Sequence, residues 1–533
     1  MTHSAELPQL LTSAAALIPS LLFVGLGLVP TKTANAKGRA FAVLASKAAL
    51  AALIAALLAA VGNVAAGPVH HVLVSAGLAS FSVHVDTLTV VMLVLVSFLG
   101  LVVTRYSVQY LDGDTNHGRF VKWLCATTGT VLMLVVAGNL ALFAAAWIAT
   151  SLSLHQLLTF YKDRPAAAAA AWKKFLISRM GDACLVGVLV LTAAQFGTWE
   201  FSELFAEASA LTPETAAGVG GIAILLVACS MLKSAQFPFH SWLPDTLDAP
   251  TPVSALMHAG IINAGGFLIV RLSPIVSQSP AALNTLALVG AFTALFASVV
   301  MMTQTSIKRS LAWSTVSQMG FMMLQCGLGV FALAVLHIVA HSLYKAHAFL
   351  SSGSVVAMAK AAWRPSGKPA AHPGLLVAIL VISGGITWVT GALFGISWTA
   401  NAGVMVLAIL FGMAQAFLLW NLWGTKFPAE LATTGLLLAV ATAVLWFTLH
   451  AAAEALLAGV VPHYAPVRHA LEHAVMGLVV LLFMAVLVLQ AQLPIWAARP
   501  GFRTLYVHAS NGFYIGAVAQ RIAQAIKLPK AAA

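Results

Sequence analysis

The chain has 533 residues, of which 61% are hydrophobic and 8% are charged, and its mean hydropathy is +0.95. Soluble domains carry about 25% charged residues, so this composition excludes a soluble globular protein and indicates a membrane protein with many spans. The 27 lysines and arginines outnumber the 15 aspartates and glutamates. They fall mainly on alternate loops, which is typical of the positive-inside rule and excludes a nucleic-acid-binding surface.

Apolar stretches of about twenty residues recur from end to end, and each is long enough to cross a ~30 Å hydrocarbon core. About fifteen spans are therefore predicted, so the expected fold is an all-α, polytopic membrane bundle. The spans lie near residues 7–30, 41–66, 85–105, 120–138, 139–160, 175–196, 217–236, 252–273, 281–304, 309–330, 331–359, 373–397, 401–423, 428–450 and 470–492. Together they make residues 1–492 the membrane bundle. The loop charges predict a periplasmic N-terminus and a cytoplasmic C-terminus in a bacterial inner membrane.

Two polar interruptions, residues 161–174 and 199–215, resemble short interfacial helices, although for the Ala-rich first one a simple connector is the favoured interpretation. Lys173 and Lys174 belong to the first of them and count as cytoplasmic loop charges. Four cysteines lie inside apolar segments without CxxC spacing, which is typical of packing residues and not of a metal site. They are Cys125, Cys184, Cys229 and Cys326.

An apolar run over residues 218–232 ends at Lys233, and Pro238 follows five residues later. A lysine inside a span costs about 2.5–3.5 kcal/mol on insertion scales, and proline cannot continue the helical hydrogen-bond ladder. The pattern predicts a broken helix beside an ion or proton path. A second interruption is expected in residues 373–397 at three glycines, Gly384, Gly385 and Gly391. Paired broken helices are typical of transporters built from two inverted repeats.

Other titratable residues fall inside the predicted spans. His337, His341 and Lys345 stand at i, i+4 and i+8, which places them on one helix face about 6 Å apart along the axis. This spacing predicts a proton relay, although histidines held by bonds between helices would be spaced the same way. His258 opens a neighbouring span. Further ionisable candidates within the spans or at their ends are Arg179, Asp182, Arg271 and His347, among others.

Lys233 needs a counter-charge to be held protonated. Asp182 is the carboxylate placed within the nearby spans, so the two are predicted to form a pair that opens and closes. Asp245 and Asp248 follow in a proline-rich stretch. Both are expected to cap helix N-termini, where anions are stabilised.

Residues 493–533 form a basic C-terminal segment in which polar residues alternate with apolar ones. Two interpretations stay open: a basic amphipathic segment in the cytoplasmic interface, or a docking site for a partner. The candidate docking residues are Arg499, Arg503, Tyr506, Asn511 and Tyr514.

The residues around these candidates resemble a known family. The run Lys233-Ser-Ala-Gln-Phe-Pro-Phe-His-Ser-Trp-Leu-Pro-Asp245, continued to His258, is similar to the signature of the antiporter-like proton-translocating subunits of respiratory complex I and multisubunit cation/proton antiporters. The resemblance covers roughly residues 80–360. It also includes Asp86, the segment 178–182, the segment 304–320 and the segment 337–346.

This resemblance implies a helix bundle in which Lys233 is the broken-helix lysine and His258 a bridging residue. It implies that His337, His341 and Lys345 form the central relay. Two features of the family are absent. The Trp-Glu pair of the fifth helix is Trp147-Ile148 here, and residues 373–425 contain no Asp, Glu, Lys, Arg or His. These losses speak against ordinary antiporter-style pumping.

Within the family, a short chain without the long lateral helix of complex I is similar to the DabB group, the membrane subunits of inorganic-carbon accumulation complexes. This implies a DabA-like partner on the cytoplasmic face that resembles a zinc-dependent carbonic anhydrase, with zinc on the partner and no cofactor in this chain. The expected function is a coupling subunit, not an enzyme, that conducts protons, or less favourably sodium ions, to accumulate CO2 as bicarbonate.

Two alternatives stay open. One is a proton-pumping subunit of a respiratory, hydrogenase-type or antiporter complex, and the other is a non-conducting membrane anchor. The retained Lys233 and Lys345 disfavour the anchor, because buried lysines are a cost that an inactive protein has no reason to bear.

Overall fold

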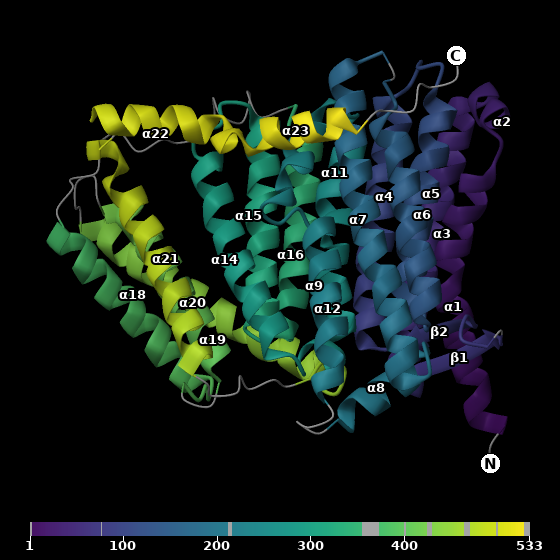
Figure 1. The fold of residues 1–533 in the computed structure, drawn as a ribbon, viewed down its shortest axis with the longest axis horizontal. Coiled ribbons are helices and arrows are strands. Elements are labelled where there is room, and N and C mark those ends of the chain that lie inside the picture. The colour runs from purple at the N-terminus through teal and green to yellow at the C-terminus, as the bar shows by residue number, and fades with distance from the viewer. Residues whose placement is uncertain are drawn as a thin grey trace.

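The computed structural model describes residues 3–526 apart from 76, 162, 212–215, 354–372, 399–400, 424–428, 463–469 and 497–498. The chain forms a bundle of long helices (Figure 1). The first helix begins at one face of the bundle, and the last two helices lie across the opposite face. We call these the N-terminal face and the C-terminal face.

The first part of the bundle contains five long helices and one short one. They are α1 (His3–Leu28), α2 (Thr31–Ala36), α3 (Gly38–Ala66), α4 (Thr87–Tyr110), α5 (His117–Val136) and α6 (Leu140–Leu158). Small residues bring these helices close together, as is usual in membranes. A Cβ added at Gly118 of α5 would lie 2.1 Å from the carbonyl of Ala34 in α2, so only glycine fits there.

The middle of the chain combines long helices with short pieces. The longer helices are α7 (Pro165–Phe196), α9 (Gly220–Lys233), α11 (Thr251–Ala259), α12 (Ala264–Arg271), α14 (Pro280–Met301), α15 (Ile307–Gly327) and α16 (Phe331–Leu350). The short helices are α8 (Phe201–Ser209), α10 (Trp242–Asp245) and α13 (Ser273–Val276), with 3-10 turns at Ala216–Val219, Phe239–Ser241, Thr246–Asp248 and Ile261–Asn263. The turn Ala216–Val219 directly precedes α9, and the turn Phe239–Ser241, α10 and the turn Thr246–Asp248 follow its end along the chain.

The last helices form a second group, which we call the C-terminal group. It contains α18 (Pro373–Leu393), α19 (Ala402–Trp423), α20 (Ala429–Leu457) and α21 (Ala470–Trp496), and it is inclined to the other helices (Figure 1). Two short helices, α22 (Pro500–Ser510) and α23 (Ile515–Ala525), then lie flat across the C-terminal face. The turn Gly512–Tyr514 joins them, and α23 packs on α7.

A β-hairpin at the N-terminal face was not expected from the sequence. Strands β1 (Val69–Val74) and β2 (Phe81–Val85) pair antiparallel with His70 opposite His84. The β-branched valines of both strands favour this extended structure. The fold is therefore helical with one small hairpin.

The predicted number of spans is confirmed. The described residues contain 13 helices long and apolar enough to cross a membrane, and α9 and α15 occupy the two remaining predicted positions. The separate interfacial helix or connector expected at residues 161–174 is wrong, because α7 already begins at Pro165 and continues to Phe196. Proline at the first turn, followed by alanines, favours that early start. Helix α8 lies within 199–215, whose last four residues fall outside the described part.

The predicted second interruption is wrong at the three glycines. Helix α18 runs unbroken through Gly384, Gly385 and Gly391 to Leu393. A Cβ at Gly384 or Gly385 would meet nothing within 4 Å, whereas one at Gly391 would lie 2.3 Å from Trp398. Glycine at position 391 therefore leaves room for the Trp398 ring. None of the three glycines breaks the helix.

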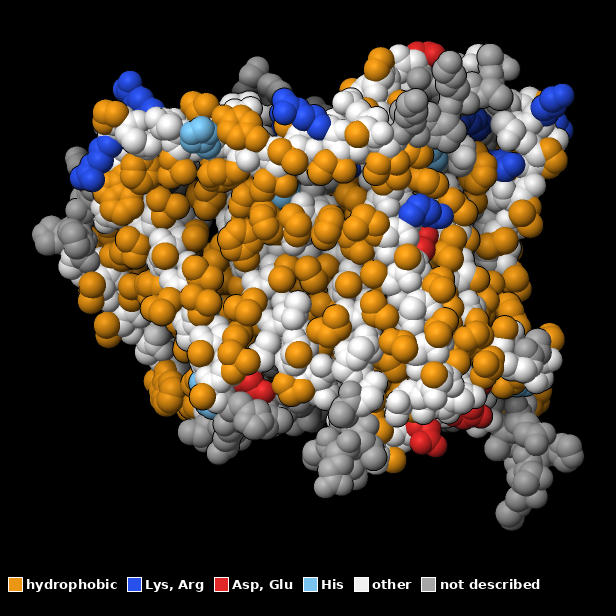
Figure 2. Space-filling view, in the orientation of Figure 1, with side chains coloured by type: hydrophobic (Ala, Val, Ile, Leu, Met, Phe, Trp, Pro, Cys, Tyr) orange, Lys and Arg blue, Asp and Glu red, His pale blue; other side chains and the backbone are white. Residues whose placement is uncertain are grey.

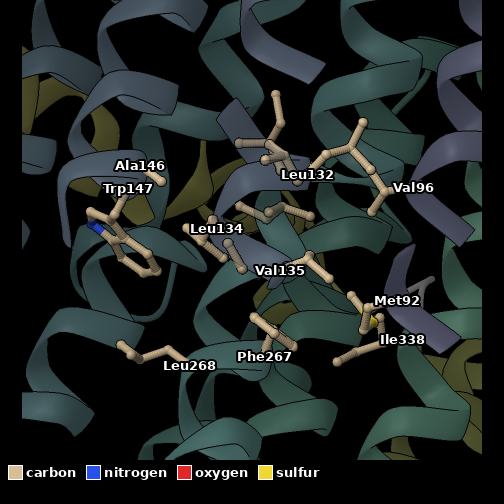
Figure 3. Packing of buried hydrophobic residues seen from close by; sticks show 14 of the residues in the cluster. Met92, Val96, Leu132, Leu134, Val135, Ala146, Trp147, Phe267, Leu268 and Ile338 are labelled. Carbon is tan, nitrogen blue, oxygen red and sulfur yellow. The ribbon is translucent and has the colours of Figure 1, made fainter. Parts of the chain in front are cut away.

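The surface confirms the membrane character of the fold. Figure 2 shows a broad band of hydrophobic side chains between the two faces, with lysines and arginines gathered near the C-terminal face. Inside, one large apolar cluster joins the first and middle parts of the chain. Figure 3 shows part of it, with Leu134 of α5 and Phe267 of α12 lying between Trp147 of α6 and Ile338 of α16. This packing fixes the helices that carry the titratable residues.

Candidate proton path

The predicted break after Lys233 is confirmed. Helix α9 ends at Lys233, and Ala235 adopts the left-handed conformation with φ 51°. Side chains replace the interrupted ladder: the Ser234 hydroxyl donates to the Ile262 carbonyl at 2.7 Å, and the Phe237 N–H donates to Thr293 Oγ1 at 3.0 Å. Irregular backbone at membrane depth needs such internal partners.

Lys233 faces an aromatic ring. Its side chain is buried, and its Nζ lies 4.3 Å from the ring centroid of Trp147. A cation over an indole face is attracted by the ring quadrupole. The contact to Lys233 therefore comes from the Trp147 ring. The next residue, Ile148, stands where the resemblance implies a glutamate.

Asp182 is paired with Arg179, not directly with Lys233. Arg179 Nη2 and Asp182 Oδ2 are 2.5 Å apart, one turn along α7, and no ion pair joins Asp182 to Lys233 within the described ranges. The two helices do touch here, because a Cβ at Gly181 would lie 3.7 Å from Leu232. The predicted switch between Asp182 and Lys233 stays a prediction that needs an intervening water.

Two buried lysines escaped the sequence interpretation. Lys174 is 3% exposed and donates to the carbonyl and hydroxyl of Ser151, at 3.0 and 2.9 Å. Lys173 is 1% exposed and forms an ion pair with Asp245. Assigning both to a loop was wrong, and the helix-start signal at Pro165 could have placed them inside α7.

The capping roles predicted for Asp245 and Asp248 are also wrong. Asp245 ends α10 and Asp248 ends a 3-10 turn, and neither carboxylate receives a cap hydrogen bond. The demand of buried Lys173 for a counter-charge explains the position of Asp245, because an unpaired buried lysine is costly.

Two histidines of α16, His337 and His341, line a groove, and Lys345 lies one turn further along the helix. Lys345 is fully buried, and its Nζ donates to Ser314 Oγ at 2.7 Å. The rings of His337 and His341 have centroids 5.9 Å apart, and His337 Nδ1 lies 2.8 Å from Gln325 Oε1. Both histidines border a groove of about 400 Å³ that is also lined by Trp446 of α20. His347, by contrast, is exposed at the end of α16.

His258 joins this line from α11. It is fully buried, and its ring stacks on Phe349 with centroids 4.4 Å apart. Among the described residues, the ring nitrogens of His258 and His341 have no hydrogen-bond partner. Groups of this kind are suited to bind ordered water, which a proton relay needs.

The titratable residues thus fall into two clusters. Electrostatic interactions connect Lys233, Lys174, Arg179 and Asp182 in the first cluster. They connect His258, His337, His341 and Lys345 in the second. Asn263 lies between them: it follows Ile262, which accepts from Ser234, and its Nδ2 donates to Ser342 Oγ on α16 at 2.8 Å. Sequence reasoning missed Asn263, because a lone asparagine gives no local signal.

A separate polar network holds the N-terminal face. Buried Arg271 contacts both carboxylate oxygens of Asp86, at 2.6 and 3.2 Å, and Asp86 caps α4 by accepting from the Thr89 N–H at 2.7 Å. This bidentate pair joins α12 to α4. Arg271 is therefore a tie between two helices and does not belong to the proton line.

Glu200 ties the β-hairpin to the start of α8. Burial opposes its ionisation, but hydrogen bonds from Ser80, Ser82 and Asn139 outweigh that effect and lower the pKa of Glu200. His70 Nε2 lies 3.0 Å from the same carboxylate, and burial lowers the pKa of His70. The histidine is accordingly neutral near pH 7.

The C-terminal segment rests on the bundle. Trp172 of α7 donates to the Ala523 carbonyl at 3.0 Å, and Gln304 donates to the Ser510 carbonyl at 3.3 Å. The predicted docking residues Arg499, Arg503, Tyr506, Asn511 and Tyr514 are all exposed. Their role in docking stays a prediction.

Comparison with known proteins identifies the family. The model for the membrane part of NADH:quinone oxidoreductase/Mrp antiporter subunits matches residues 137–423, and that for the N-terminus of complex I chain 5 matches residues 74–121. The chain belongs to this family. It is an antiporter-like, proton-translocating membrane subunit.

Individual relatives refine the comparison. The chain is 39% identical to a probable inorganic carbon transporter subunit, DabB2, of Halothiobacillus neapolitanus over 84% of this chain and 81% of the relative. It is 43% identical to DabB of Hydrogenovibrio crunogenus over 57% and 60%. It is 36% identical to NADH-quinone oxidoreductase subunit L of Mycobacterium tuberculosis over 62% and 50%.

A solved structure confirms the fold. A chain of the Mrp complex from Dietzia matches with a TM-score of 0.60 and 24% identity, over 99% of this chain and 61% of that chain.

Proposed function

We propose that this antiporter-like subunit conducts protons to drive inorganic-carbon accumulation by a membrane complex. The observation that carries the proposal is the pair of buried clusters, Lys233 with Lys174 and His258 with the α16 line, in a chain similar to DabB proteins over most of its length. Buried lysines and histidines in a span mark proton relays.

The clusters suggest an order of transfer. Lys233, over Trp147, exchanges a proton with water near the break. Ser234, Asn263 and Ser342 provide the polar link to the second cluster. There, Lys345, His341 and His337 pass the proton along α16 to the groove beside α20. Neutral imidazoles suit this task, because each can accept at one nitrogen and donate at the other.

The direction of flow is inferred from what α18 and α19 lack. These two helices carry no charged residue or histidine over residues 373–425, so an uphill path along them has no titratable carrier, whereas α20 and α21 carry the buried His450 and Glu472. We infer a single downhill path from the periplasm toward a cytoplasmic partner. The basic C-terminal face is assigned to the cytoplasm on the positive-inside rule (Figure 2).

The proposed partner is a DabA-like zinc protein bound on the C-terminal face, with α22 and α23 as part of its docking surface. Zinc would reside on the partner. Copurification from native membranes tests this assignment: a zinc protein supports it, whereas flavin and iron-sulfur subunits would favour the respiratory alternative.

Whole-cell carbon uptake tests the coupling ion. A protonophore at matched ATP levels should abolish uptake at ambient CO2. Uptake that continues after collapse of the proton gradient rules out proton drive, and strict sodium dependence assigns the same residues to a sodium-coupled scheme.

A further inference from the structure

A crevice runs along α14 and α21 beneath α22, beside the point where the Gln490 amide of α21 donates to Met302 Sδ near the end of α14 at 3.6 Å. Its upper part is a cavity of about 440 Å³ lined by Met302 of α14, Leu489 of α21 and Arg503 of α22, among others. Its lower part is a cavity of about 390 Å³ between the same two long helices, closed by α19. Figure 1 shows α21 inclined away from α14, with α22 crossing above both.

The depth of the crevice corresponds to one leaflet. Its lining residues run from 295 to 303 along α14 and from 483 to 493 along α21. At 1.5 Å per residue these stretches are roughly 12–15 Å long, and half of a ~30 Å hydrocarbon core is about 15 Å. The crevice therefore reaches from the C-terminal face to the middle of the bilayer.

The two ends of the crevice differ in chemistry. Its walls are mainly leucine, valine, methionine and phenylalanine, with Ser298, Gln325 and Gln490 in the lower part, whereas Arg503, Tyr506 and Thr303 lie at its upper end. Arg503 forms no ion pair with any residue of the described ranges. A basic residue at the membrane surface attracts anionic headgroups by about 1 kcal/mol, and an apolar space facing lipid is filled most favourably by hydrocarbon.

We propose that the crevice binds a phospholipid with an anionic headgroup. An acyl chain lies between α14 and α21, and the phosphate contacts the Arg503 guanidinium. Arg503 is thereby assigned to lipid, separate from the partner-docking role.

The bound chain has a structural task. Phe321 and Gln325 line both the lower cavity and the groove that holds His337, and Gln325 is the hydrogen-bond partner of His337. Hydrocarbon in the crevice keeps water away from the crevice side of the Gln325–His337 hydrogen bond. Water then reaches His337 and His341 only from their groove.

Two variants on the same helix test the site. Leu489→Trp fills the upper cavity, whereas Leu481→Trp places the same ring at a position on α21 that is 68% exposed outside the crevice. The purified full chain, exchanged into vesicles of phosphatidylcholine mixed with phosphatidylglycerol and extracted again, is assayed for retained lipid by mass spectrometry. The wild type and Leu481→Trp should retain phosphatidylglycerol, and Leu489→Trp should lose most of it.

Arg503→Gln provides the second arm, because it leaves the cavity intact. It should retain lipid but lose the preference for phosphatidylglycerol over phosphatidylcholine. Equal retention in Leu489→Trp and the wild type would overturn the proposal, as would a wild type with no preference for phosphatidylglycerol. Size-exclusion profiles of all variants separate these outcomes from misfolding.

Discussion

Helices α9 and α18 are both apolar, yet one is broken and the other is not. Beyond α9 the Phe237 N–H finds a substitute partner in Thr293, and the Ser234 hydroxyl satisfies the Ile262 carbonyl, whereas α18 keeps its own ladder through three glycines. The difference shows that glycine permits a break in a membrane helix but does not cause one. A break requires neighbours that satisfy the freed backbone groups, and these neighbours lie beside Lys233.

The largest expected effect is the loss of Lys233. Lys233→Ala should reduce carbon-dependent growth at ambient CO2 to background while membrane abundance stays near normal, because a buried lysine at a break adds cost instead of packing. Lys122→Ala is the control, since Lys122 also lies over a tryptophan, 5.4 Å from the ring of Trp123, but is only partly buried. Normal growth of the Lys233 variant would remove it from the mechanism.

The next prediction compares two buried side-chain amides, Asn263 in the middle part of the chain and Gln415 in the C-terminal group. Asn263→Leu should slow proton flux roughly tenfold, since losing a bridging step of about 1.4 kcal/mol has that effect on a rate. Gln415 of α19 donates to the Ala439 carbonyl at 2.7 Å, so Gln415→Leu should lower stability with flux per folded molecule unchanged. Flux in proteoliposomes and thermal stability are measured for both. Equal flux losses would erase the contrast between the halves.

Asp182→Asn should reduce coupling by roughly threefold to tenfold, which corresponds to about 0.7–1.4 kcal/mol in the barrier. The reason is the loss of a negative charge near Lys233. Arg179→Gln removes the other member of the ion pair and separates two roles for Asp182. If Asp182 serves only Arg179, the two variants will behave alike in carbon uptake; if it serves Lys233, Asp182→Asn will be worse.

The smallest effect concerns Glu200 and depends on pH. Its pKa is lowered in the folded protein, so its carboxylate stabilises the fold above the unfolded pKa of about 4.3, and this contribution disappears as pH falls through the folded value. Glu200→Gln should therefore unfold slightly earlier than the wild type near pH 7, and the gap should close at acidic pH. Fluorescence-monitored melts across pH would show whether the gap instead stays constant.

Local patterns predicted the helices, their number and the break at Pro238, because apolar length and proline act over short distances. They could not predict that Asp86 meets Arg271 or that Lys173 meets Asp245, since these pairs join residues distant in sequence. The spacing of His337, His341 and Lys345 did place them on one helix face, and the partners Gln325 and Ser314 came only with packing of α15. The sequence drew attention to Ile148 beside Trp147, and the contact between the Trp147 ring and Lys233 came only from the structure.

The flat helices α22 and α23 have a mechanical consequence. At one end α22 continues from α21, and at the other α23 is fastened to Trp172 of α7. The same helix α7 carries Lys174 and Asp182 beside the break. Helices α22 and α23 thus link the C-terminal group to α7. A tilt of the C-terminal group would displace the helix that holds the first cluster, and a protein bound on α22 and α23 would be displaced with them.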